Sequence, residues 1–228
     1  MHDKHVALVT GANRSHEGRA RLGTASGALR GAELLALLLS VPPLERDAWV
    51  DELLGIDSPP PDAPDLPRGS VPYLPCGVEE ILAMLREVPV QPDDEFVDLG
   101  AGLGRVTLLT HLLSGARATG VEIQEHLVRA ARARCADFAL PRVSFVHANA
   151  ADVELEGSVF FLYAPFNGAM LSQVLGRLEA VARRRAITVC AVDLELRDVP
   201  WLSPRQTSCV SLVLYDSQSP GVVPRSSD

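Results

Sequence analysis

The chain has 228 residues, of which 47% are hydrophobic and 22% charged, and its formal net charge is −8. This composition is ordinary for a globular protein, and the length allows one α/β domain with an appendage. The negative charge argues against non-specific binding to nucleic acid or to an anionic membrane, with a local basic patch at residues 183–185 as the one exception to weigh.

The four cysteines are scattered without a C-x-x-C pair, and the six histidines show no ligand spacing. We therefore expect reduced thiols and no metal site. The longest apolar run, near residues 34–39, is too short to span a bilayer, and the start of the chain lacks signal-peptide features. These observations predict a soluble, cytoplasmic protein with no membrane partner.

Residues 5–14, H-V-A-L-V-T-G-A-N-R, resemble the opening of short-chain dehydrogenases, whose T-G-x-x-x-G-x-G pattern binds NAD(P). Ser15 and Glu17 stand where the next two glycines belong, and no second strand with an acidic end follows at the required spacing. The Tyr-x-x-x-Lys pair is impossible because Lys4 is the only lysine. The pattern therefore predicts a loosely held N-terminal extension over residues 1–25.

Leucine spacing predicts two helices, at residues 28–39 and 44–54, which would form a small helical cap over residues 26–56. Such a cap either packs against the sheet or closes over a site. Residues 57–72 are rich in proline and lack apolar periodicity, so they predict an extended linker. A helix at residues 78–88 follows.

The stretch 95–105, E-F-V-D-L-G-A-G-L-G-R, combines the end of a buried strand, three alternating glycines and the start of a helix at residues 106–113. Glycines at such a point allow a sharp turn and let a ligand approach the backbone. Asp98 would point into the crevice where open α/β sheets bind ligands. A dinucleotide fingerprint needs its third glycine at position 105, where this chain has Arg105, and the glycine comes one residue earlier. The spacing therefore favours a different nucleotide-type ligand.

A second strand at residues 118–122 ends in Glu122 and precedes a helix at residues 125–138. A carboxylate at this place lies beside the glycine turn and can accept hydrogen bonds from two ribose hydroxyls. The alternative is a solvated strand end. The third strand, residues 143–147, is followed by Asn149, with Asp152 as a second candidate ligand or a cap for the next turn.

The fourth strand, residues 158–162, is continuously apolar, as in a strand buried on both faces of a parallel sheet. A helix is predicted at residues 169–182, and further strands at 186–193 and 209–215. Since the connection between the last two has room for at most a minor strand, we expect an abbreviated C-terminal half of the sheet. Residues 217–228 predict a disordered tail.

In order, the chain shows D-x-G-x-G-x-G after a strand, an acid at the second strand end, Asn after the third, and Y-A-P-F after the fourth. This set resembles the class I S-adenosylmethionine (SAM)-dependent methyltransferases. Fewer residues, from Tyr73 through the glycine turn, resemble the non-SET histone-lysine methyltransferases and their bacterial relatives, without implying a histone substrate. The resemblance implies a three-layer Rossmann-like methyltransferase sheet over residues 73–216, mostly parallel with an antiparallel C-terminal strand, plus the small N-terminal helical segment.

The resemblance also implies SAM as cofactor, with Glu122 on the ribose and Asp98 at the methionine amino end. Asn149 stands where many members hold the adenine amino group with Asp, and Tyr73 either folds over the cofactor or packs with its hydroxyl at the surface. The predicted cofactor-binding residues are Tyr73, Asp98, Leu99, Gly100, Ala101, Gly102, Glu122, Ile123, Asn149, Ala150 and Tyr163.

The loop after the fourth strand often reads Asp/Asn-Pro-Pro-Tyr/Phe in amino-group methyltransferases. Pro165 and Phe166 match its end, whereas Tyr163 replaces the Asp/Asn, which argues against a DNA base as acceptor. Phe166 and Asn167 are predicted to bind substrate, or else the loop is a tight turn with its aromatic rings in the core. No general base is evident, so the catalytic residues stay unassigned.

Three functions fit these residues. The first is transfer of a methyl group from SAM, by in-line displacement, to a small-molecule or protein acceptor. The second is a SAM-binding module that has lost catalysis. The third is an aminopropyl transferase of the spermidine-synthase type, which would be expected to carry more acidic residues around the fourth strand.

Overall fold

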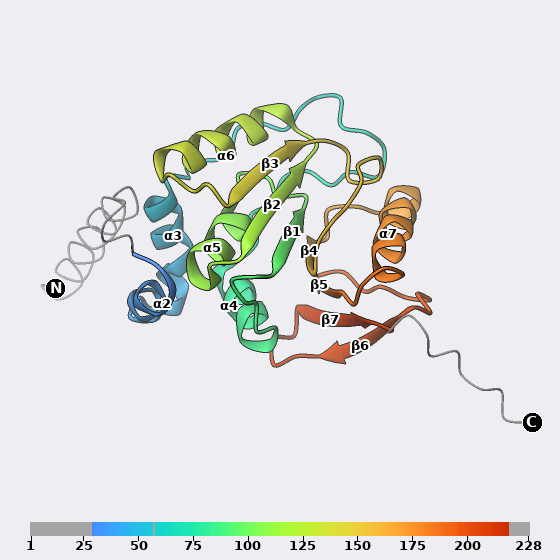
Figure 1. Cartoon of the computed structure of the whole chain (residues 1–228). Helices are drawn as coiled ribbons and strands as arrows, with labels where there is room; N and C mark the ends of the chain where they lie inside the picture. Colours follow the sequence, from blue (N-terminus) through green and yellow to red (C-terminus); the bar gives the residue numbers. More distant parts are fainter. Residues whose placement is uncertain (1–28, 57, 219–228) are drawn as a thin grey trace, which may run out of the picture.

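A seven-stranded sheet with the order β3-β2-β1-β4-β5-β7-β6 forms the centre of the protein (Figure 1). The computed structural model describes residues 29–56 and 58–218. The predicted N-terminal extension, residues 1–25, lies outside the described residues, as does all of the predicted tail from residue 219 on. The described elements are α2 (Gly31–Leu39), the 3-10 helix η1 (Pro43–Glu45), α3 (Arg46–Leu54), α4 (Val78–Glu87), β1 (Glu95–Leu99), α5 (Arg105–Ser114), β2 (Arg117–Glu122), α6 (Glu125–Asp137), β3 (Val143–His147), β4 (Val159–Tyr163), α7 (Gly168–Ala182), β5 (Thr188–Val192), β6 (Leu202–Gln206) and β7 (Leu212–Ser217).

The first five strands in the sheet order are parallel neighbours, and β7 runs antiparallel to both β5 and β6. This confirms the predicted mostly parallel sheet with an antiparallel C-terminal strand. Because parallel strands end at the same edge, the residues that follow β1 to β5 meet along one side of the sheet.

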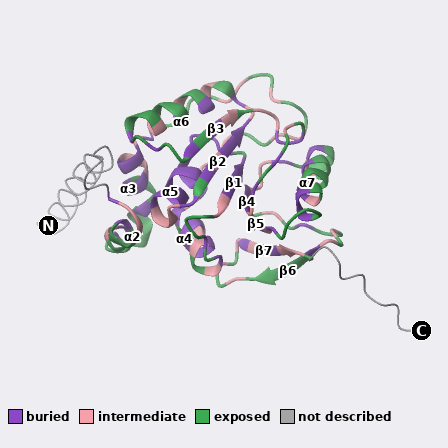
Figure 2. Ribbon diagram, in the orientation of Figure 1, coloured by how far each residue is buried: buried purple, intermediate pink, exposed green. Residues whose placement is uncertain are grey.

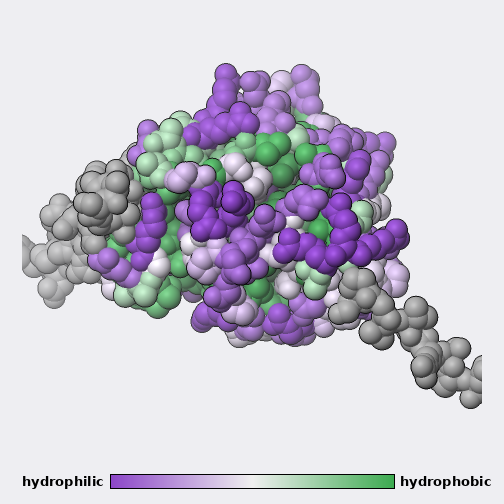
Figure 3. Space-filling model, viewed as in Figure 1, coloured by the Kyte–Doolittle hydropathy of each residue, from purple (hydrophilic) through white to green (hydrophobic). Residues whose placement is uncertain are grey.

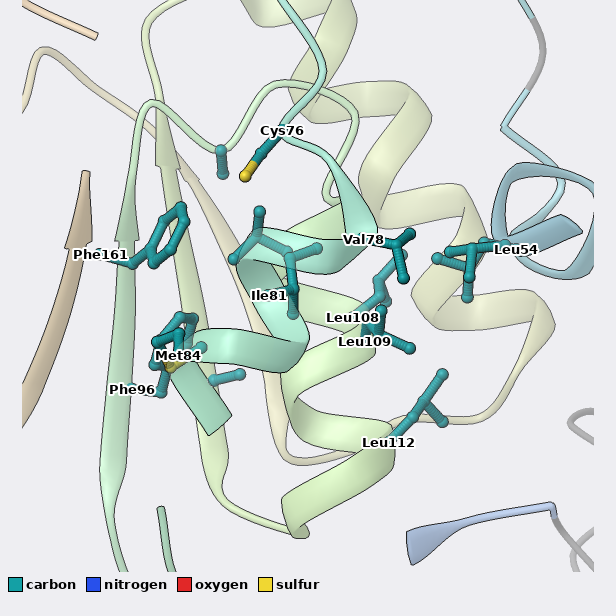
Figure 4. Packing of buried hydrophobic residues seen from close by; sticks show 14 of the residues in the cluster. Leu54, Cys76, Val78, Ile81, Met84, Phe96, Leu108, Leu109, Leu112 and Phe161 are labelled. Atoms are coloured by element: carbon teal, nitrogen blue, oxygen red, sulfur yellow. The ribbon is translucent and has the colours of Figure 1, made fainter. Parts of the chain in front are cut away.

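Helices cover the two faces of the sheet unequally. On one face, α4, α5 and α6 pack on side chains such as Phe96 and Phe161, whose ring centroids are 6.3 Å apart (Figure 4). On the other face, α7 and loops cover Phe160 and Leu162. Figure 2 shows the inner strands as mostly buried and the outer side of α6 as exposed. Burial on both faces explains the continuous apolar sequence of β4.

The N-terminal cap consists of α2, η1 and α3. The predicted second helix is divided because Pro43 begins a 3-10 turn before α3 starts at Arg46. Leu34, Leu38 and Leu53 are fully buried. Since α2 and α3 both contact α5, the cap packs against the domain and not over the open edge of the sheet.

The C-terminal half of the sheet is complete, so the predicted abbreviation is wrong. Strand β6 stands at the sheet edge, and only its first residue, Leu202, is buried. Its sequence carries little apolar signal for that reason, and an edge strand tolerates Pro204. What is short is the connection between β5 and β6, which contains no helix. Strand β7 extends to Ser217, which the sequence predicts as part of the tail.

Residues 58–76 form a strap, drawn in teal, which passes over the arrowheads of β2 and β3 in Figure 1. Hydrogen bonds hold it at two places. Asp62 Oδ1 accepts from the Tyr73 backbone N–H (2.9 Å) and from Gln124 Nε2 (2.7 Å). The second place is the loop after β4, where Val71 N donates to Pro165 O (3.2 Å) and Asn167 N donates to Gly69 O (2.9 Å). The predicted linker is therefore fixed across the edge of the sheet.

Within the part of the chain that the structure describes, no helix has the length and apolar character needed to cross a membrane. On the face seen in Figure 3, hydrophobic residues appear as scattered patches between hydrophilic ones. This face therefore offers no broad apolar surface.

Candidate functional site

The glycine turn joins β1 to α5 and is fixed to the neighbouring strand. Gly100 N and Ala101 N both donate to Val121 O, at 2.8 and 3.1 Å. Gly100 and Gly102 have φ angles of 89° and 52°, in the left-handed region that side chains disfavour. A Cβ at Gly100 would lie 2.5 Å from Pro165 Cβ, and one at Gly102 would lie 2.1 Å from Tyr73 Cε2. The turn therefore needs glycine for its backbone and for these two close contacts.

Glu122 lies at the end of β2 and ties the turn to that strand. Its carboxylate is 6% exposed and accepts hydrogen bonds from Gly102 N (2.9 Å) and Gln124 N (2.8 Å), one on each oxygen. Burial raises the pKa of Glu122, while these backbone N–H groups oppose the shift. Each oxygen keeps a further acceptor site, so the fixed carboxylate can receive hydroxyl donors from the cavity that it lines.

Asp98 is buried deeper than Glu122. Its carboxyl accepts a hydrogen bond from Thr107 Oγ1 (2.7 Å) and is 2% exposed. Burial raises its pKa to about 7, and the negative charge of Glu122 adds to this effect. It lines a small second cavity together with Tyr73 and Tyr163. Asp98 therefore lies behind the main cavity and not in its wall.

The main cavity has a volume of about 150 Å³ and follows the ends of β1 to β5 under the strap. Of the predicted cofactor and substrate residues, eight line it: Tyr73, Gly100, Glu122, Ile123, Asn149, Ala150, Tyr163 and Phe166. Asp98 and Ala101 line the second cavity. Leu99 is fully buried in the core, Gly102 lies under the Tyr73 ring, and Asn167 lies outside the lining of both cavities.

Asn149 is already engaged within its own loop. Its Oδ1 accepts from Ala151 N (3.0 Å), and its Nδ2 donates to Asp152 Oδ2 (2.9 Å). The oxygen retains one acceptor site toward the cavity. Asp152, the predicted fallback ligand, does not line the cavity and instead orients Asn149.

Several wall residues are missing from the sequence prediction. The strap contributes Ser70, Val71, Pro72 and Leu74 besides the predicted Tyr73, and the strand ends contribute Gln124 and Asp193. Asp193 follows the fifth strand directly, so the strand-end argument used for Asp98 and Glu122 was sufficient to find it. The strap residues carried no such signal, because a proline-rich segment without periodicity does not show where it folds back.

Arg105, at the place of the third glycine in a dinucleotide fingerprint, joins the cap to the turn. Its guanidinium is bidentate to the Asp51 carboxylate (2.9 and 2.5 Å) and donates to Cys76 O (2.7 Å). Burial raises the pKa of Asp51, and Arg105 opposes that shift. In the same cluster, Asp47 Oδ1 accepts from Val78 N at the start of α4 (2.7 Å). One buried arginine thus fixes α3, the end of the strap and the first turn of α5.

Residues 96–187 match the family model described as a methyltransferase domain. Among solved structures, the chain is similar to an RNA methyltransferase from Salinibacter ruber in complex with S-adenosyl-L-homocysteine, with 24% identity, a TM-score of 0.53, and coverage of 68% of this chain and 99% of that one. It is also similar to the putative methyltransferase yhhF from Escherichia coli, with 18% identity, a TM-score of 0.54, and coverage of 68% and 91%. No curated protein matches the sequence significantly.

Proposed function

We propose that the chain is a class I SAM-dependent methyltransferase, with SAM as its cofactor, and that it transfers the SAM methyl group to a small-molecule or protein acceptor at the ends of β4 and β5. The match to the methyltransferase-domain model and the likeness to a methyltransferase structure that holds S-adenosyl-L-homocysteine support this proposal. The observation that carries this proposal is the Glu122 carboxylate. It is buried beside the glycine turn, held on both oxygens by backbone N–H groups, and open to the main cavity.

The residues present fit the chemical groups of SAM. Glu122 offers two fixed acceptors for vicinal ribose hydroxyls, and Asn149 Oδ1 offers one for an exocyclic amine. Ile123 and Ala150 add apolar wall between them. Asp98, once its carboxyl group has released its proton, offers a negative charge for an ammonium group, and burial in a low-dielectric site strengthens that attraction.

Tyr73 is the residue that must move. The cavity of about 150 Å³ is smaller than the roughly 300–1,000 Å³ of small-molecule sites. The Tyr73 ring fills the space in front of Gly102 and lines both this cavity and the one that Asp98 lines. We infer that the ring swings away to join the two cavities and then covers the bound cofactor together with the strap.

SAM supplies an activated methyl group on its sulfonium when bound. The protein then has to hold the acceptor in line with that group and to exclude water, which can contribute roughly 7–11 kcal/mol of barrier reduction. The strap and the residue 165–167 loop are hydrogen-bonded to each other and close the cavity from above. This arrangement supports catalysis by positioning without a strong general base.

An RNA acceptor, as for the Salinibacter enzyme, is not part of the proposal. Among the described residues that line the main cavity, two are carboxylates and none is Arg, Lys or His. Such a lining repels phosphate groups, and the net charge of −8 acts in the same direction.

Calorimetry with SAM, S-adenosylhomocysteine (SAH) and NAD tests the proposal. We expect roughly micromolar binding of SAM and SAH and no binding of NAD, since Arg105 stands where a dinucleotide fingerprint needs its third glycine. Labelled SAM with cell extract then reports turnover. Tight NAD binding without SAM binding overturns the proposal, and SAM binding without any turnover supports a binding module instead.

A further inference from the structure

The main cavity has a second polar end, on the far side of the glycine turn from Glu122. Tyr163 ends β4, and Asp193 follows the last residue of β5; both line the same cavity as Glu122. Between β2 and β5 the sheet has two strands, so Glu122 and Asp193 lie roughly 14 Å apart by strand spacing. The two carboxylates therefore serve different parts of whatever fills the cavity.

The backbone at this second end is held in an unfavourable conformation. Ala164 and Asp193 have φ angles of 36° and 49°, which non-glycine residues rarely adopt. Hydrogen bonds from neighbouring strand ends fix both, since Ala164 N donates to Val192 O (3.2 Å) and Asp193 N donates to Ser211 O (2.9 Å). Strain of this kind persists where the surrounding structure over-determines it, and it gathers at ligand sites.

The Asp193 carboxylate is exposed at the cavity wall and has no hydrogen-bond or ion-pair partner among the described residues. Arg197, in the same loop, is paired with Glu195 (2.6 Å). Burial raises the pKa of the Tyr163 phenol, and the nearby negative charge of Asp193 adds to that rise. The second end of the cavity thus presents an uncompensated negative charge beside a neutral phenol.

Two aromatic rings accompany this charge. Tyr163 is half-buried and Phe166 is 8% exposed, and both face the cavity as lining residues. Aromatic faces attract cations, by about 0.5–2 kcal/mol depending on desolvation. A carboxylate and two aromatic rings, with no basic residue in the described lining, favour a cationic ligand over a neutral or anionic one of the same shape.

We propose that Asp193, Tyr163 and Phe166 form the acceptor subsite and that it selects a primary or secondary amine, which enters as its ammonium ion. This inference rests on the proposed methyl transfer. Asp193 acts as a positioning group. The bound ammonium releases one proton to water at the open mouth of the cavity, and the freed nitrogen lone pair forms the new N–C bond to the methyl carbon. The C–S bond breaks with its electron pair left on sulfur, so the products are a methylated ammonium ion and neutral SAH.

The test uses the full chain loaded with SAH and three probes of one shape: phenethylamine, 2-phenylethanol and 3-phenylpropionate. Calorimetry or NMR titration should give amine binding at least about tenfold tighter than alcohol binding, and no carboxylate binding. Asp193→Asn should weaken amine binding about tenfold and leave alcohol binding unchanged. Asparagine tolerates the left-handed backbone, so the variant should keep its fold.

Asp198→Asn is the matched control. Asp198 is exposed in the same loop, also has a positive φ angle (55°), and lies outside the lining of the cavity. Its substitution should change none of the three affinities. Equal binding of amine and alcohol, or equal effects of the two variants, overturns the amine subsite while SAH binding still supports methyl transfer. Failure of the wild-type chain to bind SAH overturns both.

Discussion

Glu122 and Asp193 occupy the same kind of place, each at the carboxyl end of a parallel strand, yet their surroundings are opposite. Glu122 is buried, and two backbone N–H groups fix its carboxylate. Asp193 is exposed and has no partner for its carboxylate within the described residues. The end of the site built on β1 to β3 is thus preformed, whereas the end built on β4 and β5 leaves its polar group free.

This difference suits the two components of the proposed reaction. SAM presents the same groups in every cycle, so a carboxylate that is already fixed, such as that of Glu122, can accept its hydroxyls without rearranging. The acceptor must enter, react and leave as a methylated product, which an open end allows. Four perturbations test how far the two ends differ.

The largest effect is expected for Arg105→Met, which breaks the network that holds the preformed end. It leaves the Asp51 carboxylate half-buried without its bidentate partner. Removing one partner of a buried ion pair costs roughly 3–5 kcal/mol. Urea denaturation should show that loss in the free energy of unfolding. The control, Arg183→Met, removes an exposed pair with Glu179 at the C-terminal end of α7 and should cost no more than about 0.5 kcal/mol. Similar losses in the two variants would contradict the special role of Arg105.

Asp98→Asn tests the buried proton behind the glycine turn. The folded pKa of Asp98 is raised from 3.8 to about 7, so the folded state holds its proton over a pH range in which the unfolded state has released it. Stability should therefore be highest below about pH 4 and fall as pH rises to about 7, by an amount on the order of 4 kcal/mol for this group. Asparagine stays neutral, so its advantage over the wild type should appear between about pH 4 and 7 and level off above. If the difference in denaturation midpoint between Asp98→Asn and the wild type stayed constant from about pH 4 to 7, Asp98 would be ionised in the folded protein over that whole range, which would contradict the prediction.

Glu122→Ala removes the fixed carboxylate of the preformed end. Two hydrogen bonds to a charged group are at stake, each worth about 1.5–3 kcal/mol, so SAH affinity should fall at least about 100-fold by calorimetry. Glu154→Ala removes an exposed carboxylate from the loop after β3 and serves as the control with unchanged affinity. Retained SAH binding in folded Glu122→Ala protein would place the cofactor elsewhere.

The smallest effect is expected for Asp62→Ala, which frees the strap from Gln124 and from the Tyr73 backbone. The cofactor should then dissociate faster, with about tenfold weaker SAH binding in stopped-flow measurements and little change in stability. Asp65→Ala is the control, since Asp65 is exposed in the same strap. Unchanged dissociation would mean that the strap is a fixed wall and not a cover.

Much of the preformed end follows from sequence alone. The glycine turn, Glu122 and Asn149 were predicted, because strand ends in a parallel sheet converge and because local spacing fixes which residues stand there. The mostly parallel sheet and its antiparallel C-terminal strand also agree with the prediction. The residues of the turn and of the strand ends lie close together in the sequence, within one strand–turn–helix unit, so their spacing along the chain is enough to predict them.

Tertiary structure alone decided the rest. The strap covers the site through contacts between residues 61 to 100 positions apart, such as Ala63 with Gln124 and Ser70 with Met170. The edge strand β6 is paired on one side only and needs little apolar sequence, so its pattern was too weak to predict. Asp193 lines the same cavity as Glu122 because β5 lies beside β4, although its place directly after a strand is visible in the sequence. Sequence determined the end of the cavity that we propose for SAM, because contacts within one strand–turn–helix unit build it. Long-range packing determined the end that we propose for the acceptor, because that end forms between the strap and the ends of β4 and β5.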